Sequence, residues 1–215
     1  MATATDTLTL AQWLSPAFPV GAFAYSHGLE WAIDCGDVQT QAQIRDWVAQ
    51  VVQNGAGRND MVLLAAAYRA ENSAALNRID ATARAFAASK ERLQETDLQG
   101  AAFCAAISDL HGFDVKGLTY PVALGRAAAL ARLPLELTAQ MALQAVMSNL
   151  ASIAMRLVPL GQSQGQAIIR DLTPLCMDVA SAACTATLDD LSATCFLTDI
   201  AAMRHETQYA RICRT

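Results

Sequence analysis

Apolar residues recur at helical spacing through nearly the whole chain, and this period constrains the fold more than any other feature of the sequence. The alternation of apolar and polar residues that marks half-buried strands is almost absent. The sequence has no internal repeat, no low-complexity tract and no long linker. We therefore predict an all-α fold in which residues 1–215 form a single domain, a compact bundle of roughly eight to ten helices of ordinary length.

Capping residues, glycines and prolines set the expected helix boundaries. Two Ser/Thr-x-x-Gln capping boxes, starting at Thr40 and Ser163, predict helix starts. Asn59 or Asp60 predicts another start, and Pro174 predicts a kink or a split in its helix. The predicted helices begin or run at about residues 7–14, 26 onward, 40–54, 60 onward, 73–87, 89–110, 121–131, 138–158, 163 onward and 199–211.

The composition is unusually apolar. Hydrophobic residues make up 53% and charged residues only 16% of the chain, whereas about 25% charged residues is typical of soluble domains. Part of this apolar excess is expected to contact a partner. The formal net charge of -5 argues against general nucleic-acid binding. Lys90 and Lys116 are the only lysines, and the remaining basic residues are arginines, which suit interfacial ion pairs.

No segment of the sequence predicts secretion or membrane insertion. The start, MATATDT, has neither a basic region nor an apolar core. A long uncharged run, residues 137–155, carries several amide and hydroxyl side chains, which favours a buried helix over a membrane span. The six cysteines form no C-x-x-C pair, so we expect free thiols.

One short motif matches an enzyme. GQSQG at residues 161–165 has the G-x-S-x-G form, and Asp171 or Asp178 and then His205 follow in the order of the α/β-hydrolases. That nucleophile elbow requires a strand before the serine and a parallel sheet beneath it, but the residues before Gly161 are predicted to end a helix. Ser163 is better interpreted as a helix cap, and a serine hydrolase is kept as an alternative.

Metal-ligating side chains are present but scattered. An exposed imidazole at His27 or His205, or a thiol, can bind a soft metal weakly. No spacing resembles a closed metal site, so we predict no tight metal site and no cofactor. Ordinary thiols and surface histidines are the preferred interpretation of each of these residues, and transient metal contact is kept as an alternative.

The predicted helix at 138–158 carries a lane of polar residues. Gln140, Gln144, Ser148, Ser152 and Arg156 recur every four positions, opposite an apolar face. The lane has no charge before Arg156. It is consistent with a face toward solvent or a neighbouring helix, and equally with a wet internal seam or a protein interface.

The end of the chain, RHETQYARICRT, is locally basic in an acidic protein. It is either a loose solvated end or a segment that becomes ordered on a partner. The second interpretation predicts a partner-dependent C-terminal segment at about residues 187–215.

Four blocks of sequence resemble the UreF family of urease accessory proteins. The first is SPAFPVGAFAYSHGLE at residues 15–30, and YPVALG follows at 120–125. RLVPLGQ at 156–162 is followed by Gly165-Gln166, and MRHET at 203–207 precedes Arg211. These blocks lie in the family's order over most of the chain. The terminal Ile212-Cys213-Arg214 departs from the leucine and phenylalanine that often follow the arginine.

This resemblance implies a cytoplasmic, non-enzymatic, all-α adaptor that forms a homodimer. Such proteins bind UreD (also called UreH) and recruit and modulate the GTPase UreG. The assembly delivers nickel to apo-urease, which the adaptor reaches indirectly through the complex. Nickel is thus expected to pass through the assembled complex without a tight site on this chain. A direct nickel carrier that uses His27, His205 or the cysteines remains an alternative.

The resemblance also indicates candidate residues. The prolines and glycines of residues 15–28 stiffen a loop that we expect to be part core plug and part recognition surface. Glu30, Asp60 and Arg211 are the candidates for the GTPase contact, with an arginine placed as an arginine finger. The predicted partner-binding residues are Pro19, Tyr25, Ser26, Glu30, Asp60, Arg156, His205, Glu206 and Arg211. The candidates for a polar channel are Gln140, Gln144, Ser148 and Ser152.

Overall fold

Residues 2–214 are described by a computed structural model, and in this part of the chain all regular structure is helical. It contains ten α-helices and two short 3-10 helices, η1 and η2, which confirms the predicted all-α class. The helices are α1 (Ala4–Trp13), η1 (Ala22–Ala24), α2 (Leu29–Asp34), α3 (Gln41–Asn54), α4 (Ala56–Tyr68), α5 (Ser73–Ala85), α6 (Lys90–His111), α7 (Tyr120–Leu130), α8 (Leu135–Leu157), α9 (Gln162–Thr185), η2 (Leu188–Asp190) and α10 (Phe196–His205).

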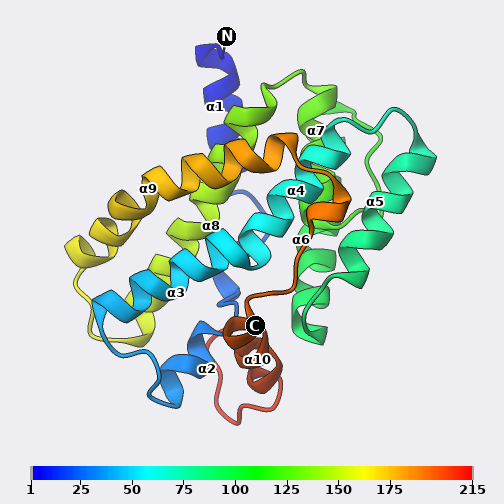
Figure 1. Cartoon of the computed structure of the whole chain (residues 1–215). Helices are drawn as coiled ribbons and strands as arrows, with labels where there is room; N and C mark the ends of the chain where they lie inside the picture. The colour runs from blue at the N-terminus through cyan, green and yellow to red at the C-terminus, as the bar shows by residue number, and fades with distance from the viewer. Residues whose placement is uncertain (1, 215) are drawn as a thin grey trace.

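The long helices α8 and α9 pack along each other, and α4 lies between α7 and α9 (Figure 1). Leu64, Leu124 and Leu143 from these helices are buried in one core. The crossing of α4 and α7 is very close because Gly125 has no side chain. A Cβ at this position would lie only 2.2 Å from the backbone oxygen of Leu64.

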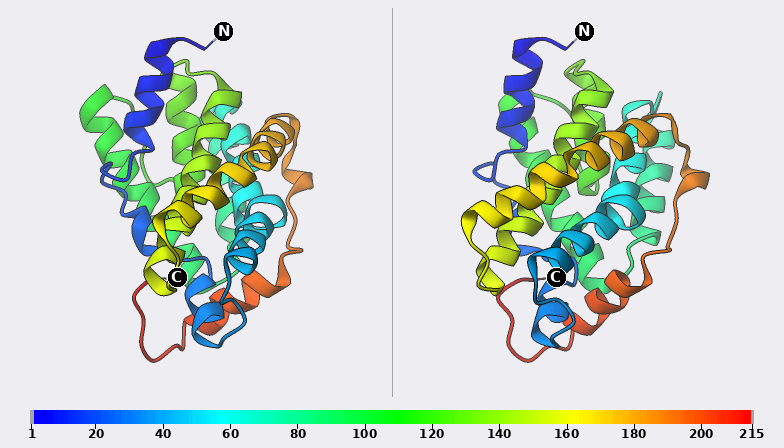
Figure 2. Two further views of the ribbon diagram at one scale, coloured as in Figure 1. Left: turned by 90° about the vertical axis from the view of Figure 1, so that its left-hand side faces the viewer. Right: turned by 60° about the vertical axis from the view of Figure 1, so that its left-hand side comes forward.

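The two ends of the chain lie at opposite ends of the molecule (Figure 2). Helix α1 extends at one end, whereas α10 packs against α2 and α6 at the other, close to the C-terminus (Figure 1). Residues 206–214, called here the tail, run back toward residues 15–28, called here the first loop. The amide of Arg214 donates to the carbonyl oxygen of Ala24 over 2.6 Å.

Several predicted boundaries are confirmed. Thr40 and Gln43 form the expected capping box of α3, and Gly112 ends α6 in the left-handed conformation. Pro121 lies in the first turn of α7. The uncharged run at 137–155 lies within α8, where Met147 and Leu150 are fully buried. No helix in residues 2–214 combines the length and hydrophobicity needed to cross a membrane. The six cysteines are free thiols.

Other predicted boundaries are wrong. Helix α4 begins at Ala56, so Asn59 and Asp60 lie inside it and use their side chains in tertiary contacts. Helix α9 begins one residue before Ser163, because Gln164 accepts a hydrogen bond from the amide of Gly161 over 2.8 Å and replaces the predicted Ser163 box.

Two further differences concern the last two α-helices. Pro174 does not split α9. It lies on the exposed face, where water can hydrate the carbonyl that lacks an amide partner. Helix α10 begins at Phe196 and ends at His205, so Arg211 belongs to the tail and not to the last helix.

Candidate functional site

The first loop divides its aromatic side chains between the core and the surface. Phe18 and Tyr25 are buried, with 7% and 4% of their surface exposed, whereas Phe23 is 60% exposed. Pro16 and Pro19 are exposed on the outer side of the loop. The loop therefore has one face in the core and one face on the surface, as its composition predicts.

Polar side chains of α8 hold the first loop in place. Asn149 Nδ2 donates to the carbonyl oxygens of Ala22 over 2.8 Å and Tyr25 over 3.2 Å. Arg156 Nη2 donates to the carbonyl oxygen of Phe23 over 2.6 Å. Arg156, predicted to bind a partner, thus also fixes the loop conformation in this chain.

At the end of the loop, Ser26 and Gly28 join it to α2 and α10. The buried Ser26 hydroxyl accepts a hydrogen bond from the Glu30 amide over 3.2 Å. Gly28 has φ +75, and a Cβ there would lie 2.6 Å from the amide nitrogen of Ala202 in α10. Only glycine satisfies both the backbone conformation and this close approach.

Next to the loop, four charged side chains from α2, α6, α10 and the tail form one group, called here the latch cluster: Glu30, Glu91, His205 and Arg211. The His205 ring is fully buried. Its Nδ1 lies 2.7 Å from Glu91 Oε2 and its Nε2 lies 3.2 Å from Glu30 Oε2. Arg211 Nη1 lies 2.5 Å from Glu91 Oε1.

Hydrogen bonds hold the tail in place. They involve the carboxylates of the latch cluster and Glu206, the first residue of the tail. The amides of Ile212 and Cys213 each donate to a different oxygen of Glu30 over 2.6 Å. Burial opposes ionisation of Glu30, but these two amides and His205 outweigh it and lower its pKa. Glu206 Oε1 accepts from the Lys90 amide over 2.8 Å at the start of α6.

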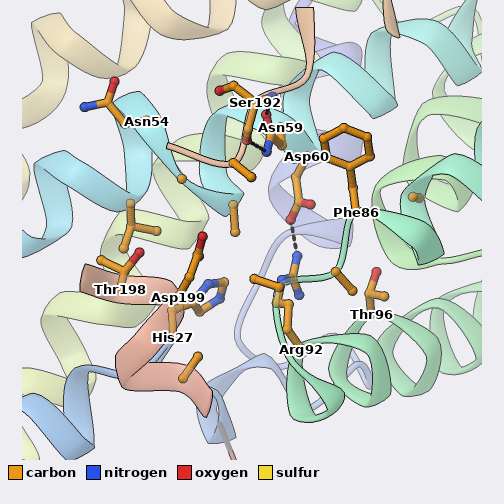
Figure 3. Close-up of a pocket in the computed structure, with 18 of the residues that line it drawn as sticks. His27, Asn54, Asn59, Asp60, Phe86, Arg92, Thr96, Ser192, Thr198 and Asp199 are labelled. Atoms are coloured by element: carbon orange, nitrogen blue, oxygen red, sulfur yellow. Dashed lines mark hydrogen bonds and ion pairs between the residues drawn. The ribbon is translucent and has the colours of Figure 1, made fainter. Parts of the chain in front are cut away.

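A second buried charge network lies deeper, between α4, α6 and the first loop (Figure 3). Arg92 Nη2 is 2.5 Å from Asp60 Oδ2, and Arg92 Nη1 is 3.1 Å from Glu95 Oε2. His27, whose φ is +52, places Nε2 3.3 Å from Glu95 Oε1. Burial by itself would raise the pKa of Glu95, but Arg92 and His27 outweigh burial and lower this pKa to about 2. At Asp60 burial is the larger effect, and the pKa is raised.

Two cavities open on either side of this network. One, the α10 cavity, has a volume of about 310 Å³ and lies between α4, the start of α6 and α10 (Figure 3). The other, the α8 cavity, has a volume of about 520 Å³ and lies between the first loop and α8. His27, Asp60 and Arg92 line both cavities, so this charged network separates them.

The predicted polar lane of α8 lies only partly in the α8 cavity. Gln144, Ser148 and Ser152 line it, and Gln144 Nε2 donates to Ser148 Oγ over 3.1 Å. Gln140 does not belong to its lining, because its side chain turns toward Glu136 instead. Gln140 therefore lies apart from the other three channel candidates in this structure.

The residues of the hydrolase alternative are not brought together. Ser163 is exposed in the first turn of α9, and no strand precedes it in residues 2–214. Both ring nitrogens of His205 contact glutamates, and Asp171 contacts Arg170. A nucleophile elbow with a base within reach is thus not formed by these residues.

Among the described residues, no group of three or more histidine, cysteine or acidic side chains is arranged to hold a metal ion. His27 and His205, the imidazoles of the nickel-carrier alternative, instead contact Glu95 and the latch-cluster glutamates. A metal would have to displace these ion pairs.

Helix α10 exposes an apolar face that the sequence analysis missed. Phe196, Leu197, Ile200 and Met203 are 67%, 78%, 49% and 51% exposed. In the tail, Tyr209 and Ile212 are also exposed. Helical spacing alone predicts which residues share a face, but not whether that face is covered, so the sequence held no signal for this exposure.

The buried charges of α6 were missed as well. Glu91, Arg92 and Glu95 fall in a polar stretch that is typical of a solvated first turn. Nothing in the spacing distinguishes them from surface charges, because their partners come from α4, α10, the first loop and the tail.

Comparison with known proteins identifies the family of this chain. The family model described as UreF matches residues 38–173. The protein named urease accessory protein UreF from Ruegeria pomeroyi is 56% identical over 100% of both chains. The UreF of Roseobacter denitrificans is 52% identical over 97% of this chain and 93% of its own. A Cereibacter sphaeroides UreF is 50% identical over 97% of this chain and 98% of its own. The chain therefore belongs to the UreF family of urease accessory proteins.

Proposed function

We propose that this chain is a cytoplasmic, non-enzymatic adaptor that binds UreD (UreH) and recruits and modulates the GTPase UreG, so that nickel reaches apo-urease. It acts as a homodimer, has no resident cofactor and reaches apo-urease only through the complex. The observation that carries the proposal is the exposed apolar face of α10, continued by the tail. A patch of this kind on a protein with few charges is typical of a docking surface.

The docking surface for UreD is formed by the α10 face and the neighbouring tail. Phe196, Leu197 and Ile200 supply apolar area, while Asp199 and Arg204 supply polar edges on the same helix. The first loop lies against this helix at Gly28, and we assign its exposed Phe23 and Pro19 to the same docking surface. The partner-dependent segment at about 187–215 is the main part of this surface; Thr215 lies outside the described residues.

A charge on the α10 face tests this assignment. Leu197→Asp is expected to abolish co-elution with UreD in size-exclusion chromatography, because an aspartate would lose hydration on docking. Leu8→Asp is the matched control, since Leu8 is 71% exposed on α1, at the far end of the molecule. Both variants should keep the thermal unfolding midpoint. Normal assembly of Leu197→Asp, or loss of assembly in both variants, would contradict the proposal.

Modulation of UreG is assigned to the arginines beside the first loop and tail. Arg211 pairs with Glu91 and Arg156 binds the Phe23 carbonyl, so each is already ordered on the surface. Glu30 and Asp60 are buried or partly buried and act by positioning the tail and Arg92. GTP turnover in the assembled complex should change in Arg156→Ala and Arg211→Ala. Unchanged turnover in both would remove the arginine-finger idea.

Nickel passage is proposed along the α8 cavity toward the α10 cavity. Ser148→Leu together with Ser152→Leu is expected to block nickel transfer without breaking assembly, because two leucines replace polar groups that line the α8 cavity. Gln140→Leu is the matched control on the same helix, outside that lining. Full urease activation in the double variant, or equal loss in the control, would count against this route.

A further inference from the structure

The latch cluster contains a contact that requires a hydrogen on each ring nitrogen of His205. Glu30 is held ionised, because its two oxygens accept the Ile212 and Cys213 amides and its pKa is lowered. An ionised carboxylate only accepts hydrogen bonds. His205 Nε2, 3.2 Å from Glu30 Oε2, must therefore carry a hydrogen and donate it.

The same reasoning applies to the other nitrogen. A neutral ring with its hydrogen on Nε2 presents a lone pair at Nδ1, yet Nδ1 lies 2.7 Å from Glu91 Oε2. Two acceptors at this distance repel, so a proton lies between them. The second oxygen of Glu91 accepts a hydrogen bond from Arg211 Nη1, so this carboxyl group acts as an acceptor on both oxygens and the proton is placed on the ring.

We propose that His205 is an imidazolium ion in the latch cluster, and that docking of residues 205–214 onto α2 and α6 takes up one proton from solvent. This inference concerns regulation of the proposed UreD-docking surface, but it is a property of the isolated chain. Its charge balance is complete: the imidazolium and Arg211 offset the carboxylates of Glu30 and Glu91. Without the proton, the buried cluster would hold an uncompensated negative charge.

The groups that face the His205 ring do not take up this proton themselves. From the tail, Arg211 keeps its charge, and burial beside Glu30 raises the pKa of the Cys213 thiol to about 12. Glu206 is engaged by the Lys90 amide, and Arg156 of α8 acts on Cys213 as a permanent charge. A histidine is the side chain whose charge changes at physiological pH.

The consequence is a pH-dependent latch. An exposed histidine loses its proton near pH 6.5 or so, about the unperturbed value. Above that pH, the undocked segment is neutral at His205 and docking must bind a proton. The docking equilibrium constant then falls about tenfold for each pH unit, the value for uptake of one proton. Docking is complete at lower pH and weakens as the pH rises.

Nuclear magnetic resonance of the isolated full-length chain with ¹⁵N-labelled histidine tests the protonation state directly. We expect both His205 nitrogens to be protonated at pH 7, while the exposed His111, whose Nε2 accepts a hydrogen bond from Trp13 Nε1, serves as the reference signal. A single neutral tautomer of His205 in the folded chain at pH 7 would overturn the proposal.

Hydrogen exchange tests the linkage. The protection factors of the Ile212 and Cys213 amides should fall as the pH rises above about 7, with a limiting slope of about tenfold per pH unit for the uptake of one proton. His205→Gln, which holds no titratable proton, should show no such slope, whereas the His111→Gln control should keep it. Protection independent of pH in the native chain would refute proton uptake. Because no partner is present, these results are independent of whether UreD docks on α10.

Discussion

Among the buried charged residues, Arg92 is predicted to be the one whose substitution lowers the stability of the fold the most. Its guanidinium neutralises Asp60 on α4 and Glu95 on α6, and the three side chains are 12%, 17% and 4% exposed. Arg92→Met keeps much of the volume but removes the guanidinium from both carboxylates, in a site that water barely reaches. Breaking a buried ion pair from one side costs about 3–5 kcal/mol.

Urea denaturation followed by circular dichroism at pH 7 measures this loss as a shift in midpoint at unchanged slope. Arg92→Lys should lose less, because an ammonium keeps the charge but cannot bridge both carboxylates in the same geometry. The control is Arg170→Met, whose ion pair with Asp171 has side chains 76% and 41% exposed. An exposed pair is worth at most about 1 kcal/mol.

The pH dependence of the same variants tests the cause. The lowered pKa of Glu95 stabilises the native chain above the unfolded value and is lost as the pH falls toward about 2. The difference in unfolding free energy between the native chain and Arg92→Met should therefore narrow on acidification, as the carboxylates that have lost Arg92 take up protons. A loss below about 1 kcal/mol at pH 7, or a gap that stays constant with pH, would refute the reasoning.

Three other outcomes are expected. Gly125→Ala should destabilise the chain by at least about 2 kcal/mol, because the added methyl group meets an α4 carbonyl oxygen 2.2 Å away. The control, Gly161→Ala at an open helix start, should lose less than about 1 kcal/mol. Urea denaturation measures both losses. Asn149→Ala removes two hydrogen bonds to the first loop and should speed proteolysis at residues 15–28, with a stability loss of about 1–3 kcal/mol; unchanged proteolysis would contradict the anchoring role. In Glu95→Gln, the loss of stability below about pH 4.5 should be less steep, because the variant lacks the carboxylate whose pKa is lowered to about 2. Thermal unfolding midpoints measured across the acid range test this.

The sequence by itself determined the helical class and most helix positions. Helical period, the Thr40 capping box, Gly112 and Pro121 act within a few residues, and local hydrogen bonding and sterics decide their effect. The stiffness of the first loop could also be predicted from the sequence, because prolines restrict the backbone and glycines free it in any surroundings. Local rules failed at Ser163 because Gln164 caps Gly161 instead.

Only the tertiary structure decided which polar residues act together. Glu30, Glu91, His205 and Arg211 come from three helices and the tail, and their contact depends on how α10 docks against α2 and α6. The spacing of the apolar residues in α10 likewise does not predict that their face is exposed, since a covered face and an uncovered face have the same helical period. Burial and charge pairing depend on distances between remote segments, and these are set by packing of the whole chain.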